Sequence, residues 1–208
     1  MMQFAHAHLR KAAGLQFYKL MGSGKDDGFN PFPDWSTYSL LMTWDHESDA
    51  VDFIHNSALF DAYRKRTEKV WTIYMKNIIA KGKWSGKNPF SKNTELDKNI
   101  SKLAVITRAT IRLSKLRKFW NYVPTSSLPL AGNKGLIYTK GIGEVPVLQM
   151  ATFSLWENEQ ALKDFAYNSI EHHRAIQKTK ELNWYKEELF SRFQPYREEG
   201  ERFSMLNG

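Results

Sequence analysis

The chain has 208 residues, of which 42% are hydrophobic and 25% are charged, and this balance excludes a disordered protein. Its net charge is +8, but basic and acidic residues are interspersed, which favours a solvated surface over a nucleic-acid-binding stripe. The sequence has no cysteine, which excludes disulfides, cysteine metal sites and cysteine nucleophiles. It shows no signal peptide and no apolar run of about 18 residues. We therefore expect a cytoplasmic protein, and peripheral association with an anionic membrane surface stays open.

The first part of the chain, residues 1–90, is predicted to form an αββαβ unit. Its helices and strands are expected, in that order, at residues 3–13, 15–21, 38–44, 48–68 and 71–80. A complete βαββαβ unit would open with one further strand, which has no counterpart in this part of the sequence. Because its omission would leave an unpaired sheet edge, we interpret the chain as beginning after that strand.

Residues 91–102 are polar and rich in Lys, Asn and Ser, which predicts a linker to a second unit at residues 103–208. A turn with Gly141 and Gly143 is expected between its middle strands, and another turn at residues 184–189. The order βαββαβ is that of a ferredoxin-like unit. The expected elements are a strand at 103–112, a helix at 114–130 interrupted at Pro124, strands at 136–140 and 145–156, a helix at 158–180 and a strand at 190–197.

An internal repeat relates the two units. Residues 44–64 align with residues 156–176 at an offset of 112 without a gap. Six of the 21 aligned positions are identical, against about one expected by chance. We therefore predict an α+β protein of two fused ferredoxin-like repeats, whose sheets cover each other in a barrel-like sandwich with the helices outside.

Several longer motifs resemble the spheroidene monooxygenase family in sequence and in order. They are QFYKLMGSG at residues 16–24, TRATIR at 107–112, GIGEVP at 141–146 and ATFSLW at 151–156. The resemblance implies an architecture of the dimeric α/β barrel type, a haem cofactor with its iron, dioxygen and an electron donor. It also implies that hydroxyl and then keto oxygen is introduced into an acyclic carotenoid or a similar lipophilic substrate. The architecture leads us to expect a homodimer.

Two adjacent histidines are the candidates for the iron ligand. In a helix at residues 158–180, His172 and His173 border an apolar stripe from either side. From the residues alone, a hydrogen-bonded histidine at the edge of the core is the stronger interpretation. The resemblance favours iron ligation, because related haem-binding barrels place the proximal histidine on this helix. We predict His172 as the ligand and His173 as the alternative. The other histidines are expected on the surface: His6, His8, His46 and His55.

Two arginines are the candidates for catalysis. Strand alternation places Arg108 and Arg112 on one face, where their guanidinium groups would bind haem propionates or dioxygen. The alternative is the charged solvent face of an edge strand. The resemblance favours the first interpretation, and we predict both arginines as site residues.

Two glycine motifs are predicted to contact the cofactor. They are Gly22-Ser23-Gly24 and the pair Gly141 and Gly143. A helix directly follows neither motif, which argues against a phosphate-binding loop. Tight turns between strands are the better interpretation, and such turns would let the backbone approach a flat macrocycle.

The sequence leaves two further functions open. One is a haem enzyme with dehydratase or peroxidase chemistry, and the other is a cofactor-free barrel that binds a small ligand and in which the histidine pair is structural.

A set of aromatic residues would line a channel for a polyene or pack in the core. They are Phe29, Phe32, Trp35, Phe119 and Trp120.

Overall fold

The computed structural model describes residues 2–25, 32–127, 133–168 and 182–202. In chain order the elements are α1 (Met2–Leu9), β1 (Leu15–Gly24), β2 (Pro33–Trp44), α2 (Glu47–Asn56), α3 (Ala58–Arg64), β3 (Trp71–Gly82), β4 (Leu103–Ile111), the 3₁₀ helix η1 (Leu113–Lys115), α4 (Leu116–Ser127), β5 (Leu136–Val145), β6 (Gln149–Trp156), α5 (Glu159–Asn168) and β7 (Tyr185–Gly200).

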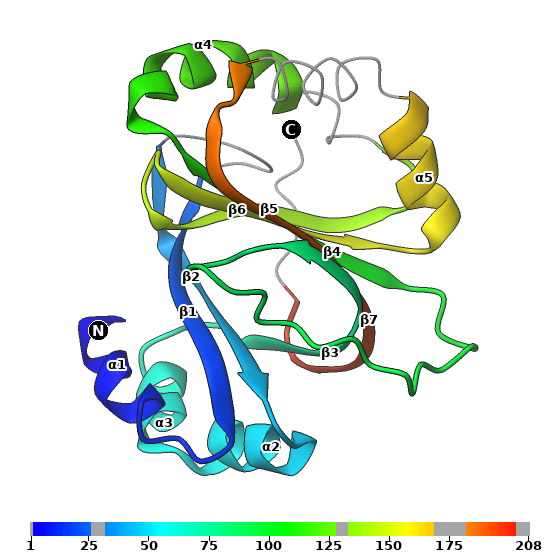
Figure 1. Cartoon of the computed structure of the whole chain (residues 1–208). Helices are drawn as coiled ribbons and strands as arrows, with labels where there is room; N and C mark the ends of the chain where they lie inside the picture. Colours follow the sequence, from blue (N-terminus) through cyan, green and yellow to red (C-terminus); the bar gives the residue numbers. More distant parts are fainter. Residues whose placement is uncertain (1, 26–31, 128–132, 169–181, 203–208) are drawn as a thin grey trace.

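All seven strands belong to one antiparallel sheet with the order β2-β1-β5-β6-β4-β7-β3. The sheet curls, with α4 and α5 above it in Figure 1 and α1, α2 and α3 below it. The predicted α+β class with ferredoxin-like repeats is confirmed. The division at residues 91–102 stays a prediction, because the sheet is continuous across both units. Within the described residues, no helix combines the length and the apolar character that crossing a membrane requires.

The two edge strands of the sheet, β2 and β3, both belong to the first unit, in which β4 of the second unit has no described counterpart. In the second unit the opening strand β4 pairs with β6 and β7. The repeat makes β2 and β3 the counterparts of β6 and β7, and these two strands end the sheet on either side. Among the described residues no strand lies between β2 and β3, so an equivalent of β4 would pair at this position.

The internal repeat is visible in the helices. Helix α5 begins 112 residues after α2 (159 − 47), the same offset as the repeat in the sequence. The single helix predicted at residues 48–68 is wrong, because the chain leaves the helical conformation at Ser57 with φ −80° and ψ 143°. The Ser57 Oγ accepts a hydrogen bond from the backbone N of Phe60, which caps the new helix α3. The later part of the helix predicted at 158–180 lies outside the described residues.

Three predictions about the second unit are wrong. Gly141 and Gly143 lie inside β5, and the chain turns after Val145, with Val147 at φ 60°. The turn predicted at 184–189 is largely strand, because β7 already begins at Tyr185. Helix α4 includes Pro124 and is not interrupted there. In the first two cases, pairing with neighbouring strands overrides the local preference for a turn.

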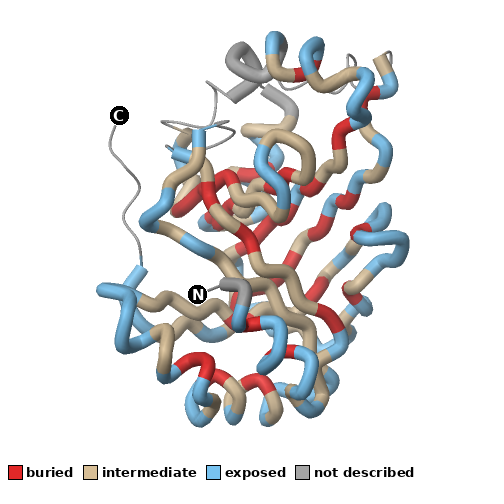
Figure 2. Tube along the Cα trace, turned by 90° about the vertical axis from the view of Figure 1, so that its left-hand side faces the viewer, coloured by how far each residue is buried: buried red, intermediate tan, exposed pale blue. Residues whose placement is uncertain are grey.

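The hydrophobic core is divided between the two faces of the sheet, and Figure 2 shows buried residues concentrated along the strands. The inner, concave face holds the largest cluster, which also takes Trp84 and Phe90 from the segment between β3 and β4. On the outer face separate clusters lie under α2, α4 and α5. The central strand β4 therefore has buried residues on both of its faces, whereas the edge strand β2 has none.

A bulge near the start of β2 is fixed by Asp34. Its carboxylate accepts hydrogen bonds from the Ser36 backbone N at 2.9 Å and from the buried Lys140 Nζ at 3.2 Å. Burial raises the pKa of Asp34, but the hydrogen bonds from Ser36 and Lys140 outweigh it and lower the pKa to about 2. The charged carboxylate therefore stabilises the folded protein.

We expect the Asp34→Asn variant to show a weaker loss of stability in acid than the wild type. The folded pKa lies below the ordinary value of 3.8. The stabilisation is therefore complete above about pH 4 and is lost as the pH falls toward 2, and it amounts to about 2 kcal/mol. Urea unfolding between pH 5 and pH 2 measures this difference. Parallel pH profiles for the two proteins would contradict it.

Candidate functional site

The outer face of the sheet has a strip that neither α4 nor α5 covers. The outward residues of β4 are its odd-numbered ones: Ile111 packs under α4, whereas Leu103 and Val105 pack under α5. Between these two clusters lie Thr107 and Ala109, and Thr107 is exposed although β4 is a central strand. This exposure marks the strip as a surface open to a ligand.

Small residues continue the strip across neighbouring strands. Thr107 pairs with Thr152 of β6, which pairs with Gly141 of β5. In the next row, Gly22 of β1 pairs with Gly143 of β5, and the larger Met150 of β6 stands between Gly143 and Ala109. We call these six residues the small-residue strip: Gly22, Thr107, Ala109, Gly141, Gly143 and Thr152.

The repeat explains why the two glycine motifs meet. Strands β1 and β5 are equivalent in the two units, and they pair antiparallel at Gly22 with Gly143 and at Ser23 with Ile142. Equivalent strands that meet about a local two-fold axis bring equivalent residues together. The sequence predicted both motifs as site residues, and the structure places Gly22, Gly141 and Gly143 in one surface. Ser23 instead points inward and donates a hydrogen bond to the Thr37 carbonyl.

The tight turn predicted for the first motif is wrong, because Gly22, Ser23 and Gly24 all lie within β1. Gly24 ends this strand and pairs with Pro33. A side chain at Gly143 would bring its Cβ within 2.7 Å of the Gln149 carbonyl oxygen, so glycine is required for the close approach of β5 and β6. A Cβ at Gly22 would meet no atom within 4 Å. The backbone of β1 at Gly22 is therefore accessible from the outer face.

Arg108 lies on the opposite face of β4 from the strip. It is only 3% exposed, and its guanidinium group pairs with Glu187 of β7 and lies 3.9 Å from Glu144 of β5. The same group stacks over the Trp84 ring, 5.6 Å from its centroid. Because β4 is central, the alternative of an edge strand with a charged solvent face is excluded. A catalytic role for Arg108 stays a prediction, and its contacts favour a structural role.

Glu187 joins this arginine to the segment after β3. Its carboxylate accepts hydrogen bonds from the backbone N of Ser85 at 2.9 Å and of Gly86 at 2.7 Å. Burial raises the pKa of Glu187, but these amides and the charge of Arg108 outweigh it and lower the pKa. The glutamate is therefore ionised at neutral pH and binds the loop to β4.

Glu144 completes the network on the inner face. It accepts a hydrogen bond from Trp84 Nε1 at 2.6 Å and pairs with Lys19 of β1, whose Nζ also donates to Ser85 Oγ at 2.7 Å. Two cations, Lys19 and Arg108, thus balance two carboxylates. Lys19, Glu144 and Glu187 were not predicted as site residues. The turn expected at 184–189 concealed the strand alternation that directs the Glu187 side chain inward.

The other predicted site residues lie apart from this network. Arg112 follows the end of β4, is exposed, and donates its backbone N–H to the Trp184 carbonyl. His172 and His173 lie outside the described residues. The four described histidines are exposed, as predicted: His6, His8, His46 and His55. In the described part of the chain, no group of three or more His, Asp or Glu side chains is arranged to hold a metal ion.

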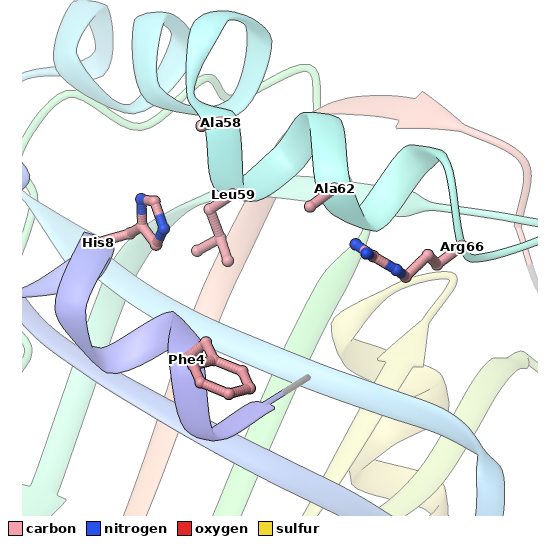
Figure 3. Close-up of a pocket in the computed structure, with 6 residues that line it drawn as sticks. All are labelled: Phe4, His8, Ala58, Leu59, Ala62 and Arg66. Carbon is pink, nitrogen blue, oxygen red and sulfur yellow. The ribbon is translucent and has the colours of Figure 1, made fainter.

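A shallow groove of about 300 Å³ lies between α1 and α3. Figure 3 shows Phe4 and His8 on α1 facing Leu59 and Ala62 on α3, with Arg66 at one end. Phe4 is 77% exposed, and His8 and Arg66 are exposed as well. The groove has no buried polar group facing it among its lining residues, so we assign it no chemistry.

The small-residue strip is the surface that fits a flat macrocycle such as haem. Its three glycines have no side chain, so a ring can lie close to the backbone of β1 and β5. Met150 stands between Gly143 and Ala109 and bounds this bed at β6. The residues that the structure describes are therefore compatible with the cofactor, and the predicted iron ligand His172 lies outside them.

Comparison with known proteins identifies related sequences. None of the protein-family models compared with the chain matches it. Spheroidene monooxygenase of Cereibacter sphaeroides is 34% identical over 86% of this chain and 55% of its own length. The enzymes of the same name from Rhodobacter capsulatus and Rubrivivax gelatinosus are 33% and 31% identical, over 89% and 90% of this chain and 78% and 71% of their own lengths. The chain thus spans about half the length of the first of these curated relatives.

Two solved structures resemble the fold at low sequence identity. One is a protein of Fusobacterium nucleatum, with a TM-score of 0.45 and 12% identity over 96% of this chain and 86% of that one. The other is from Lactobacillus acidophilus, with a TM-score of 0.42 and 11% identity over 95% and 86%. We base no functional argument on them. The sequence relatives decide the family: this chain belongs to the spheroidene monooxygenase family.

Proposed function

We propose that this protein is a haem-dependent monooxygenase that oxygenates an acyclic carotenoid or a similar lipophilic polyene. Its relatives are named spheroidene monooxygenase, and a monooxygenase activity agrees with their sequence identity to this chain. The observation that carries the proposal within the molecule is the small-residue strip, whose glycines leave the backbone of β1 and β5 open between two apolar clusters. A macrocycle and an extended polyene both need such a surface.

The residues around the strip would position the two ligands. Gly22, Gly141 and Gly143 would form the bed of the ring, and His172 is the proposed iron ligand. When bound, haem would supply the activation of dioxygen. The clusters under α4 and α5 would keep water from the two ends of the strip. Arg108, on the inner face, would link β4 through Glu187 to the loop at Ser85 and Gly86.

The reaction balances with an external reductant. One C–H bond of the polyene, one dioxygen molecule, two electrons and two protons give a C–OH group and water. A second hydroxylation at the same carbon gives a geminal diol, which loses water to form a ketone. We propose a one-electron donor protein as the source of the electrons.

The proposal predicts a Soret band that depends on His172. Wild-type protein, purified from haem-supplemented cells, should contain stoichiometric haem, and the His172→Ala variant should lose it because the iron loses its protein ligand. His173→Ala is the matched control and should keep the band. Absorption spectra of the oxidised and reduced proteins measure both.

The remaining outcomes separate the alternatives. A Soret band lost only in His173→Ala would identify His173, instead of His172, as the iron ligand. A folded wild-type protein that binds no haem would contradict the cofactor and favour a cofactor-free ligand-binding barrel. Turnover of a small substrate without reductant would favour dehydratase or peroxidase chemistry over oxygenation.

A further inference from the structure

The hairpin of β1 and β2 exposes three aromatic side chains. Phe32 is 67% exposed, Trp35 is 75% exposed and Tyr38 is 51% exposed. We call these residues the aromatic arm. They lie within seven residues of one another, and the exposed Lys25 donates its backbone N–H to the Phe32 carbonyl across the hairpin. Three large aromatic side chains exposed within one short segment are unusual for a solvent face, and exposed apolar patches mark interaction sites.

A β-bulge in β2 directs Trp35 toward solvent. Gly22 pairs with Tyr38, but the next residue, Ser23, pairs with Asp34, so residues 35–37 have no partner on β1. Asp34 fixes the bulge through Ser36 and the buried Lys140, and Ser23 Oγ donates to the Thr37 carbonyl at 2.9 Å. Bulges in sheets commonly re-aim a side chain. Here two buried polar residues, Ser23 and Lys140, stabilise a backbone that projects an exposed tryptophan.

The arm is continuous with the small-residue strip. Tyr38 lies directly across from Gly22, and Gly22 pairs with Gly143. Five spacings between neighbouring strands separate β2 from β7, which is roughly 24 Å of surface. At its far end Phe190 of β7 pairs with Thr107 and is 36% exposed. The row that starts at Tyr38 and Gly22 continues through Gly143, Met150 and Ala109, and it is uncharged until it reaches the exposed Glu188 of β7. An extended apolar molecule could therefore pass from the arm onto the strip as far as β4.

The chemistry of the arm fits a lipid bilayer that contains anionic lipid. Tryptophan and tyrosine combine an apolar ring with a polar N–H or O–H group, and they concentrate at membrane–water interfaces. The chain carries a net charge of +8, which attracts it to an anionic surface at long range. A carotenoid substrate dissolves in the bilayer rather than in water.

We propose that the aromatic arm docks the protein onto the surface of an anionic bilayer, with Trp35 as the main anchor. Docking would bring the end of the strip at Gly22 against the lipid, so that a polyene reaches the site without entering water. This last step rests on the proposed function, whereas the docking itself does not.

Flotation of the full-length protein with lipid vesicles tests the docking. Wild-type protein should float with phosphatidylcholine vesicles that contain phosphatidylglycerol, and more weakly with phosphatidylcholine alone. Trp35→Ser should bind the mixed vesicles at least about tenfold more weakly, because an interfacial aromatic ring is lost. Trp35→Phe should retain most of the binding. Phe4→Ser is the matched control, since Phe4 is 77% exposed on α1 outside the arm, and it should bind like the wild type.

The outcomes that contradict the proposal are distinct. Wild-type protein that stays unbound, or a folded Trp35→Ser variant that floats as well as wild type, would overturn it. Sedimentation without vesicles provides a second test: a dimer that Trp35→Ser abolishes would assign the arm to a second copy of the chain instead. Flotation needs neither haem nor carotenoid, so a negative result here leaves the oxygenase proposal standing, and an inactive oxygenase that floats leaves the docking standing.

Discussion

Replacing Arg108 by alanine is expected to lower the free energy of unfolding by about 3 kcal/mol. The guanidinium group is almost fully buried, and its removal leaves Glu187 and Glu144 without their shared cation. The backbone amides of Ser85 and Gly86 and the Lys19 ammonium compensate for part of this loss. Urea unfolding at pH 7 measures the change, and a thermal scan should show a Tm lower by roughly 6–12 °C.

Arg197→Ala is the matched control for this prediction. Arg197 also lies on a strand, pairs with Glu199 and stacks over Tyr74, but its side chain is 40% exposed. Exposed ion pairs contribute only about 0–1 kcal/mol, so this variant should unfold close to wild type. Equal losses in the two variants would mean that burial of the Arg108 network does not stabilise the fold. Unchanged stability in Arg108→Ala would have the same meaning and would favour a catalytic role for this arginine.

Replacing Gly22 by valine is expected to keep the fold and to abolish most of the function. No atom lies within 4 Å of the position that a Cβ would take, so the side chain enters open space over the strip. Valine favours a strand more than glycine does, and the stability should stay equal or rise by about 0.5–1 kcal/mol. The side chain would overlap with a ring or polyene on the strip and weaken its binding by about 10- to 100-fold.

Haem titration and carotenoid turnover, together with urea unfolding, measure the effects of Gly22→Val. Lys81→Val is the control, because it adds valine at an exposed position of β3 outside the strip. Haem binding and turnover equal to wild type in Gly22→Val would remove the strip as the ligand surface. A loss of stability in Gly22→Val would instead mean that the fold of β1 requires glycine at this position.

The sequence predicts the elements that have a strong local pattern or a copy in the other unit. The repeat from Trp44 and from Trp156 placed α2 and α5 in register, and the order of strands and helices followed from periodicity. The helix predicted at residues 48–68 is interrupted at Ser57, because the serine side chain caps the N-terminus of α3. The sequence alone does not show whether a serine lies inside a helix or caps the start of the next one. Whether the helix breaks at Ser57 depends on how α3 packs, which the local sequence does not show.

The site was less accessible to prediction, because its contacts are distant in sequence. Arg108 and Glu187 are 79 residues apart and meet only because β4 and β7 are neighbours. The glycine motifs looked like turns, since glycine is common in turns, and only the pairing of β1 with β5 shows them as part of one surface. Strand alternation did indicate that Arg108 faces away from Ala109, but it could not show which face carries the helices.

Turnover under ¹⁸O₂ shows whether the protein transfers an oxygen atom from dioxygen to a carotenoid. Wild-type protein with haem, an electron donor and an acyclic carotenoid in anionic vesicles should give a hydroxylated product that contains one oxygen atom from ¹⁸O₂, measured early by mass spectrometry before a keto oxygen exchanges with water. We expect this incorporation to require the reductant. A product whose oxygen comes from water, or a haem-loaded protein that leaves every polyene unchanged, would contradict it.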